Sequence, residues 1–190
     1  GNIRVGGSEL FVTEACEYTN SFLSFFPNRE VILNIEADHL DFFKDIDDIR
    51  RSFRKFAELL PEGGTLIINS DIRDHEEIHR GLSCRVVTVG SDPEKSRYSA
   101  AHVTFDESAC ASYELLENGK TVCTVTLSVP GMHNVYNSLA AFAAARELGV
   151  EESGIDWMTD NCINVFAGSM RNHTKALTRD EVKQIYLEAF

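Results

Sequence analysis

The sequence predicts an α/β fold, with a mostly parallel sheet flanked by helices and a small antiparallel meander beside it. Short apolar runs at 30–35, 65–69 and 85–89 are typical of strands that a parallel sheet buries on both faces. Segments with helical patterns alternate with these runs, as α/β units require. From 98 to 129, polar and apolar residues alternate instead, which indicates antiparallel strands.

The N-terminal part predicts two strands and a helix. A strand over 9–14 ends in an acid, and the strand over 30–35 follows it. A helix then runs from 47 to 60, because apolar residues recur on one face of that segment. Asp47 or Asp48 is its expected N-cap, and a proline and two glycines end it.

The alternation continues through the middle of the chain. The third strand, 65–69, is followed by a short polar helix over 74–80 and by the fourth strand, 85–89. Gly90 closes that fourth strand.

The meander and the helix after it have clear turn signals. Asn118-Gly119 predicts a tight hairpin turn between 113–117 and 121–129. Pro130-Gly131 closes the meander, and an Ala-rich amphipathic helix is expected over 134–148. The sequence therefore predicts a hairpin that leads directly into a long helix.

Three further features lie toward the C-terminus. A helix is expected over 153–166, and the loop 166–171 that follows ends at Arg171. An arginine at such a place suits bidentate contact with phosphate, although a solvated surface charge is the simpler alternative. The residues 178–181 have the spacing of a capping box at the start of a last helix.

Composition limits the classes of function. The chain has 190 residues, of which 43% are hydrophobic, and this suffices for one sizeable core. The net charge of −12 argues against binding to nucleic acid, which needs a basic stripe. One basic cluster falls on the helix predicted over 47–60 and is interpreted as a solvated helix face; its members are Arg50, Arg51, Arg54 and Lys55. An anionic nucleotide remains an acceptable ligand, because backbone N–H groups and one metal ion suffice to bind it.

The sequence also predicts a reduced, cytoplasmic protein without a membrane segment. No apolar run approaches the roughly 20 residues that a membrane span needs, and no secretory signal precedes the first strand. The five cysteines contain no C-x-x-C pair. A disulfide framework or a zinc site is therefore not expected.

Polar residues follow the first two predicted strands. Glu14 lies at the carboxyl end of the first strand, and His39 comes shortly after the second. Ligands of open α/β sheets bind outside the carboxyl ends of the strands, so a carboxylate and an imidazole there could hold a divalent cation. The alternative is that the acids only cap helices and that His39 is an ordinary loop residue.

A second polar group opens the Ala-rich helix. His133, Asn134 and Asn137 follow the Pro130-Gly131 pair, and the two asparagines are i, i+3 neighbours on one helix face. Because an amide both donates and accepts hydrogen bonds, such a pair suits the edge of an adenine ring. Helix capping by Asn134, with Asn137 as a polar surface residue, is the alternative.

Four segments together resemble the Mur ligase family, the ATP-dependent amide-bond ligases of peptidoglycan precursor synthesis. The segment 14–18 (E-A-C-E-Y), with S-F-L shortly after it, is similar to the family's E-A-[CD]-E-x…S-F-L. Likewise, 34–41 is similar to N-I-x-x-D-H-x-D, 130–141 to P-G-x-H-N-x-x-N-x-x-A-A, and 166–171 to F-x-G-x-x-R. Each segment alone is weak evidence, whereas four in the family's order are specific.

The resemblance implies roles for these residues. It implies a central ATP-binding domain with a P-loop type of fold, in which Glu14 and His39 bind Mg²⁺ near the γ-phosphate. Asn134 and Asn137, beside His133, would contact the adenine of ATP. Arg171 would lie near the phosphates.

The resemblance also implies a reaction. It indicates the branch of the family that joins L-alanine to UDP-N-acetylmuramate in the cytoplasm, through an acyl phosphate. Relatives that add later amino acids carry a carbamylated lysine on the helix after the D-H segment, and Phe53 occupies its approximate place here. Two alternatives stay open: a recycling ligase that adds a tripeptide to the same sugar, and a non-catalytic nucleotide-binding domain.

The sequence departs from the family pattern at both ends. A G-x-x-G-K-[ST] phosphate loop, which the family places before the first matched strand, does not occur in it. We therefore expect residues 1–171 to be a central domain truncated before that loop, and this fragment alone to be inactive and to bind ATP weakly. Residues 172–190 are expected to be a separate tail, either a junction or a remnant of the next domain.

Overall fold

The computed structural model describes residues 10–150. Arg171, Cys162, the helix predicted over 153–166, and the segment 172–190 with its capping box lie outside the described residues.

The described residues form one six-stranded sheet in which the spatial order of the strands follows the chain. The first four strands pair in parallel, and the last three form an antiparallel meander. The strands are β1 (Arg29–Ile32), β2 (Thr65–Asn69), β3 (Arg85–Gly90), β4 (Tyr98–Phe105), β5 (Cys110–Glu117) and β6 (Lys120–Pro130). The predicted fold class is confirmed.

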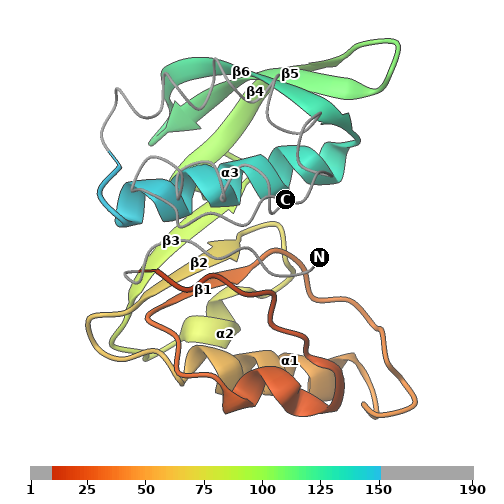
Figure 1. Ribbon diagram of the computed structural model, residues 1–190, viewed down its shortest axis with the longest axis vertical. Helices are drawn as coiled ribbons and strands as arrows, with labels where there is room; N and C mark the ends of the chain where they lie inside the picture. The colour runs from red at the N-terminus through yellow and green to blue at the C-terminus, as the bar shows by residue number, and fades with distance from the viewer. Residues whose placement is uncertain (1–9, 151–190) are drawn as a thin grey trace, which may run out of the picture.

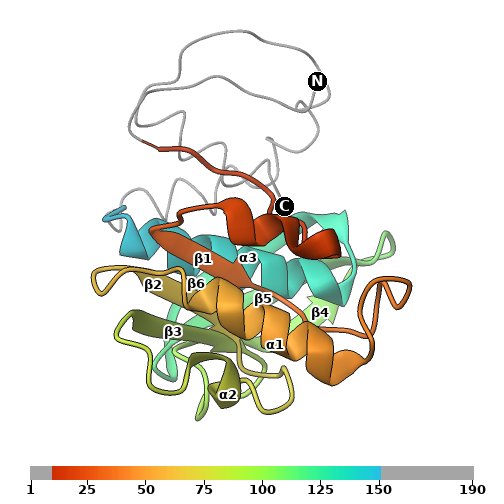
Figure 2. The ribbon, with the colours of Figure 1, turned by 90° about the horizontal axis from the view of Figure 1, so that it is seen from below.

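Helices cover both faces of the parallel part of the sheet. The helices α1 (Ile46–Ala57) and α2 (Glu76–His79) lie on one face, and α3 (Met132–Glu147) lies on the other (Figures 1 and 2). A short 3₁₀ element, η1 (Tyr18–Ser24), precedes β1 and contacts α1. The chain therefore forms three layers, as its alternating pattern predicts.

Strand β2, which lies between β1 and β3, divides the core into two clusters. All five of its residues are buried, since both of its faces are covered. Ile67 belongs to the cluster under α3, whereas Leu66 and Ile68 belong to the cluster under α1 and α2. This arrangement explains why the strand has a continuous apolar run rather than an alternating one.

The meander extends the sheet past the carboxyl ends of the parallel strands. Strand β4 pairs with β3 only through Val89–Tyr98 and Gly90–Ser99. The hairpin between β5 and β6 turns at Asn118 and Gly119, whose φ angles of +51° and +73° are those of a type I′ turn. The turn predicted from Asn118-Gly119 is confirmed.

The first predicted strand is wrong within the described part of the chain. Residues 10–17 have no regular structure, and Phe11 is 86% exposed. A short apolar run forms a strand only where a neighbouring strand accepts its hydrogen bonds, and no strand among residues 10–150 pairs with this segment. Strand β1 is also shorter than predicted, ending at Ile32 rather than at Ile35.

The N-cap of α1 also differs from the prediction. Asp45, rather than Asp47 or Asp48, caps the helix, and its carboxylate accepts a hydrogen bond from the backbone N–H of Asp48 at 2.8 Å. Asp47 and Asp48 instead lie in the first turn, where negative charge favours the helix dipole.

Two arginines of the basic cluster have structural partners. Arg50 donates to the carbonyl oxygens of Arg73 and Asp74 at 2.6 and 2.8 Å, and Arg54 donates to that of Arg80 at 2.8 Å. These bonds attach α1 to the segment around α2. The interpretation of this helix face as merely solvated is therefore wrong for Arg50 and Arg54.

Helix α3 runs antiparallel to β2 and β3. Near its beginning, the Tyr136 phenol lies close to Asp71 and Ser91, which come just after β2 and β3; burial and the neighbouring Asp71 carboxylate raise the pKa of this phenol. At its end, the carboxylate of Glu147 lies 3.2 Å from the guanidinium of Arg85, the first residue of β3. The start of α3 therefore lies at the carboxyl edge of the parallel strands, where α/β proteins bind ligands.

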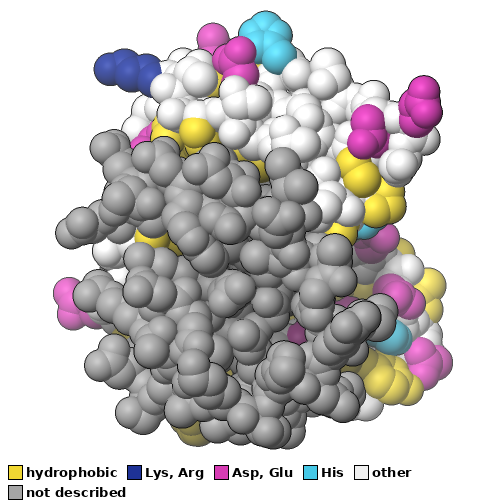
Figure 3. All heavy atoms as spheres, turned by 45° about the horizontal axis from the view of Figure 1, so that its top comes forward, with side chains coloured by type: hydrophobic (Ala, Val, Ile, Leu, Met, Phe, Trp, Pro, Cys, Tyr) yellow, Lys and Arg dark blue, Asp and Glu magenta, His cyan; other side chains and the backbone are white. Residues whose placement is uncertain are grey.

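The surface of the described part agrees with the composition. In the view of Figure 3, acidic side chains are spread over the described surface and basic ones are few. None of the helices within residues 10–150 has the length and apolarity that crossing a membrane would require. Cys16, Cys84 and Cys110 are free thiols.

A buried carboxyl group lies at the opposite, amino edge of the sheet. Glu30 on β1 is 2% exposed, and neither of its carboxylate oxygens has a hydrogen-bond partner among residues 10–150. Burial raises the pKa of Glu30 to about 8, so the folded protein holds this side chain protonated at neutral pH.

This burial predicts a pH dependence of stability. The raised pKa means that the folded state binds a proton that the unfolded state releases, so stability is highest below the ordinary pKa of 4.5 and falls as pH rises to about 8. Between pH 5 and 7 the loss should be roughly 2–3 kcal/mol. Urea unfolding at several pH values should show that Glu30→Gln removes this decrease. The exposed Glu62→Gln is the control. The prediction would be contradicted if the free energy of unfolding of wild type and of Glu30→Gln changed with pH in parallel.

Candidate functional site

His39 lies in a cluster of polar and aromatic side chains beyond the end of β1. Its Nε2 is 3.6 Å from Oε1 of Glu17, and both side chains are about one third exposed, at 34% and 31%. The ring of Tyr18 lies 4.6 Å from that of His39. Tyr18 also donates a hydrogen bond to Asp41 at 2.7 Å. The segment before β1 and the loop after it thus meet at this point.

The backbone at this cluster has an unusual conformation. Thr19, Asn20 and His39 have φ angles of +57°, +59° and +53°, which side chains other than glycine rarely adopt. Local hydrogen bonds hold His39 there, because its carbonyl accepts from the N–H groups of Phe42 and Phe43 at 2.9 Å each. Asn20 is hydrogen-bonded through its side chain to Ser52 of α1. Such conformations cluster at functional sites.

The acid nearest to His39 is Glu17, which was not among the residues predicted from the sequence; the carboxylate of Asp38 lies 4.0 Å from Nδ1. Glu14 is exposed, follows no strand, and makes no ion pair with His39 in the described part of the chain. The signal for Glu17 was present, because it is the second acid of the same 14–18 segment. The strand predicted over 9–14 would have placed Glu14, at its carboxyl end, in this position instead.

The charges of the cluster are set by hydrogen bonding. The bond from Tyr18 holds the pKa of the Asp41 carboxyl below its ordinary value, and the same bond raises the pKa of the Tyr18 phenol. Asp41 therefore stays ionised at neutral pH. The cluster offers negative charge and an imidazole nitrogen to a ligand.

The donor atoms fit a divalent cation that takes its other ligands from elsewhere. Two ligands at about 2.1 Å in neighbouring positions of an octahedral ion are about 3 Å apart, so small side-chain rotations would let Glu17 and His39 share one ion. Residues 10–150 contain no group of three or more acidic, histidine or cysteine side chains placed to hold a metal. A cation here would depend on water and phosphate oxygens, as magnesium commonly does.

The second predicted group lies at the start of α3. Gly131 is the N-cap with φ +100°, and a side chain at this position would come within 2.6 Å of the His133 ring. Asn134 donates to the carbonyl of Pro130 at 2.8 Å, and Asn137 donates to Oδ1 of Asn134 at 3.0 Å. No side-chain hydrogen bond caps the helix, so the alternative of capping by Asn134 is wrong.

The two asparagines form one amide face, as their spacing predicts. Their mutual hydrogen bond orients both amides, and each NH₂ group retains a second N–H because an amide carries two. His133 beside them is exposed. This face can offer donors and an acceptor to a planar polar ligand.

A third polar group, which the sequence analysis did not select, joins the strand ends. Asn69 donates to the carbonyl of Leu33 at 3.1 Å and accepts from the backbone N–H of Asp71 at 2.9 Å. Asn69 thereby connects the end of β2 to the residues that follow β1. The sequence had a weak signal for it, an amide at the end of a buried strand.

Phe53 is partly buried against the hydrophobic cluster under α1. Its ring packs edge to face on that of Phe22, 5.4 Å away. The position that resembles a carbamylated lysine of other relatives is thus apolar here.

Comparisons with known proteins agree with this geometry. The family model of the Mur ligase middle domain matches residues 2–145. A UDP-N-acetylmuramate–L-alanine ligase of Lachnospira eligens is 54% identical over 185 residues, which are 97% of this chain and 39% of that protein. The enzyme of the same name from Agathobacter rectalis is 52% identical over 155 residues, which are 82% of this chain and 34% of that protein.

Solved structures also match the fold. The crystal structure of UDP-N-acetylmuramate–alanine ligase from Thermotoga maritima has a TM-score of 0.55 and 26% identity, over 68% of this chain and 28% of that one. The chain thus spans about two fifths or less of the length of these relatives. Because the family model matches most of its residues and its strands and helices take the matching arrangement, the chain belongs to the Mur ligase family as a middle domain.

Proposed function

We propose that the full-length protein is an ATP-dependent ligase that joins L-alanine to UDP-N-acetylmuramate, and that this chain is its nucleotide-binding middle domain. The observation that carries the proposal is the 54% identity to a ligase of that name over 97% of the chain. An enzyme that consumes ATP and a nucleotide-linked sugar would work in the cytoplasm.

The placement of the polar groups supports a nucleotide site. The loop with His39 follows β1, and the amide face opens α3 at the carboxyl edge of β2 and β3. In this arrangement, Asn134 and Asn137 would contact the adenine of ATP, with His133 beside them. Glu17 and His39 would hold Mg²⁺. Glu14, as a ligand, and Arg171, as a phosphate contact, stay predictions from the resemblance.

The proposed reaction has two steps. The lactyl carboxylate of the sugar first attacks the γ-phosphorus of ATP, which forms an acyl phosphate and releases ADP. The amine of alanine then attacks the acyl carbon and phosphate leaves. When bound, Mg²⁺ would neutralise charge on the phosphate oxygens. The chain's own residues would bind and orient the nucleotide, because phosphoryl transfer depends mainly on positioning and electrostatics.

Two other functions remain alternatives. A recycling ligase would add a preformed tripeptide to the same sugar, and a non-catalytic nucleotide-binding domain would add nothing. The names of the relatives at 54% and 52% identity favour the alanine enzyme over both.

A substrate panel tests the proposed function. The full-length protein should form UDP-N-acetylmuramoyl-L-alanine from ATP, Mg²⁺ and the two substrates, with one phosphate released for each product. Product formation is measured by mass spectrometry and phosphate release by a coupled assay. Preference for a tripeptide over L-alanine would favour the recycling ligase, and no product with either amine would favour the non-catalytic domain.

Variants of the two acids separate the candidate ligands. In the full-length ligase, His39→Ala and Glu17→Gln should each lower kcat by at least about 100-fold, since removing a ligand or oriented charge has effects of this size. Glu14→Gln should lower kcat much less than Glu17→Gln does if Glu17 is the ligand. The exposed Glu36→Gln is the matched control. A large loss from Glu14→Gln with near-normal turnover of Glu17→Gln would reverse the assignment.

The amide face predicts an effect on nucleotide affinity. Asn137→Ala removes a hydrogen-bonding side chain and the bond that orients Asn134, so the KM for ATP should rise roughly fivefold to 30-fold. The KM for UDP-N-acetylmuramate should stay nearly constant. Asn28→Ala, an exposed amide before β1 at the opposite edge of the sheet, serves as control. Equal rises in both KM values would argue against adenine contact.

A further inference from the structure

Tyr18 connects the segment before β1 with the loop after it. Its phenol donates to Oδ2 of Asp41 at 2.7 Å. Its ring lies 4.6 Å from that of His39, tilted by 31°, and 6.1 Å from that of Phe42 in an edge-to-face contact. One side chain thus contacts three residues of the loop, which follow it in the sequence by 21 to 24 positions.

The backbone of Tyr18 is fixed to the core. Tyr18 begins η1, in which Phe22 is 1% exposed and stacks on Phe56 of α1 with the ring centroids 4.5 Å apart. The hydroxyl of Ser21 lies 2.8 Å from the carbonyl oxygen of Cys16 and 3.0 Å from that of Tyr18. The backbone N–H of Phe22 donates to the same carbonyl of Cys16 at 3.0 Å. The Tyr18 side chain therefore extends from a turn that is attached to the apolar cluster under α1.

The loop that carries His39 is held differently. The backbone N–H of His39 donates to Oδ1 of Asp38 at 2.7 Å, and its carbonyl accepts from the N–H of Phe43 at 2.9 Å. Phe43 is buried, so the loop is attached to the core after His39 rather than at it. These contacts form the turn, but they do not bring the imidazole to Glu17. Tyr18 does so, because it directly follows Glu17 in the chain and lies against the imidazole.

We propose that Tyr18 is a positioning residue for the divalent cation, which it serves by holding the loop of His39 against the segment of Glu17. This inference rests on the cation site proposed at these two residues. Tyr18 supplies no ligand. Its contribution is to keep the imidazole and the carboxylate facing one another before a cation arrives, which lowers the ordering that binding requires. Its bond to the ionised Asp41 is stronger than a bond between neutral groups.

Binding of Mn²⁺ to the full-length, nucleotide-free ligase tests this role without turnover. Mn²⁺ is paramagnetic and broadens the NMR signals of nearby nuclei, so a titration reports how tightly the site holds it. The protein is isotopically labelled in its histidine rings, and the signal of His39 is the one that disappears in His39→Gln. In the wild type, Mn²⁺ should broaden this signal selectively.

Tyr18→Phe is the decisive variant, because it keeps the ring and removes only the hydroxyl that reaches Asp41. The midpoint of the Mn²⁺ titration should rise roughly threefold to tenfold, the effect expected of one lost hydrogen bond to a charged group. Tyr18→Leu loses the ring contact as well, and the rise should be roughly fivefold to 30-fold. Removal of the ring should also move the His39 signal before any Mn²⁺ is added, whereas Tyr18→Phe should leave it near its original place.

Turnover supplies a second measurement. In both variants, the free Mg²⁺ concentration that gives half of the maximal rate should rise by similar factors. The kcat at saturating Mg²⁺ should change less than about twofold, since the reacting groups are not touched. A purely structural role for Tyr18 would instead lower the melting temperature without a selective effect on either cation, which would contradict the inference.

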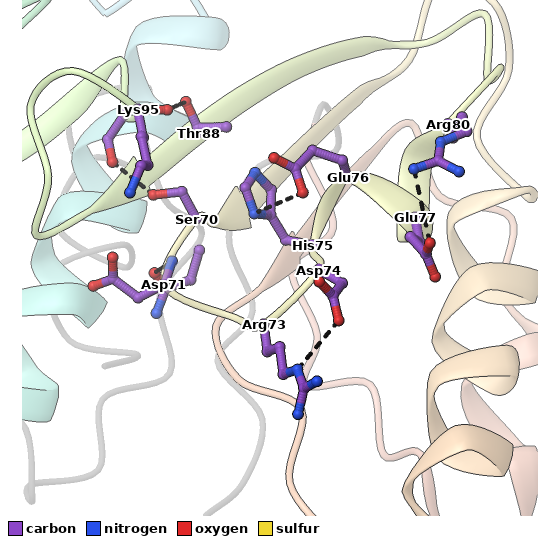
Figure 4. Close-up of polar contacts among 12 residues, drawn as sticks. Ser70, Asp71, Arg73, Asp74, His75, Glu76, Glu77, Arg80, Thr88 and Lys95 are labelled. Atoms are coloured by element: carbon purple, nitrogen blue, oxygen red, sulfur yellow. Dashed lines mark hydrogen bonds and ion pairs between the residues drawn. The ribbon is translucent and has the colours of Figure 1, made fainter.

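Asp41→Asn and Asp74→Asn form a matched pair. Both acids are exposed and lie in loops that follow parallel strands, but the carboxylate of Asp74 lies 3.3 Å from the guanidinium of the 93% exposed Arg73 (Figure 4). Asp41→Asn should raise the Mn²⁺ midpoint, since an amide is a weaker acceptor than a carboxylate. Asp74→Asn should leave it unchanged. An equal rise in both would mean that net charge, rather than the bond from Tyr18, is responsible, and would overturn the inference.

The outcomes are distinguishable. A folded Tyr18→Phe protein whose Mn²⁺ midpoint stays within twofold of wild type would overturn the inference, even if Tyr18→Leu fails to fold. A wild type whose His39 signal is not broadened by Mn²⁺ would remove the cation site and the inference with it. A wild type that binds Mn²⁺ at His39 but makes no alanyl product would remove the proposed reaction, while the Mn²⁺ titrations would still test Tyr18.

Discussion

The attachment of α3 to the sheet at both of its ends is the constraint on which the site depends. In its second turn, the Ser138 hydroxyl is hydrogen-bonded to that of Tyr113 on β5 at 2.7 Å, and Tyr136 lies close to Asp71 and Ser91 beyond the carboxyl ends of two strands. At its end, Glu147 lies 3.2 Å from Arg85 and 3.3 Å from Arg97, with its side chain only 7% exposed. A helix attached at one end alone could rotate or slide on the apolar face beneath it, because apolar contacts are not directional. Hydrogen bonds and ion pairs fix its direction and height, and hence where Asn134 and Asn137 lie.

The loop beyond β1 supplies the other half of the site by a different means. His39 lies in a left-handed backbone conformation and is oriented by neighbours from another segment, Glu17 and Tyr18. Two positive-φ residues, Thr19 and Asn20, lie in that segment as well. Strained backbone of this kind persists only where the surrounding contacts hold it, here through Asn20 and Ser52 of α1. One half of the site is thus built on a rigid helix, and the other on loops attached to α1.

Elements with strong local patterns could be predicted from the sequence. The apolar run of β2, the Asn118-Gly119 turn and the Ala-rich helix each carry a periodicity or a turn requirement that leaves few alternatives. Most failures arise where a long-range contact decides the outcome. The segment 10–14 has a strand-like pattern but no partner within residues 10–150, and Glu17 rather than Glu14 lies beside His39, a residue 22 positions further along the chain. The cap of α1 was missed by two residues, since three nearby aspartates are chemically equivalent in sequence. The hydrogen bonds between Asp71 and Ser91 could not be predicted, because the two residues are 20 positions apart and no local pattern links them.

The narrow junction between β3 and β4 has a consequence for how the chain acquires its structure. The antiparallel strands are neighbours in sequence and close through short turns, whereas the parallel pairs β1–β2 and β2–β3 must first bring together residues separated by a helical crossover. Loop-closure entropy grows with that separation, so local pairings form at lower entropic expense. Only two residue pairs join the parallel strands to the meander, so a hairpin that forms early offers β3 few positions for pairing. We therefore expect α3, which spans both regions, to couple their assembly into one cooperative transition.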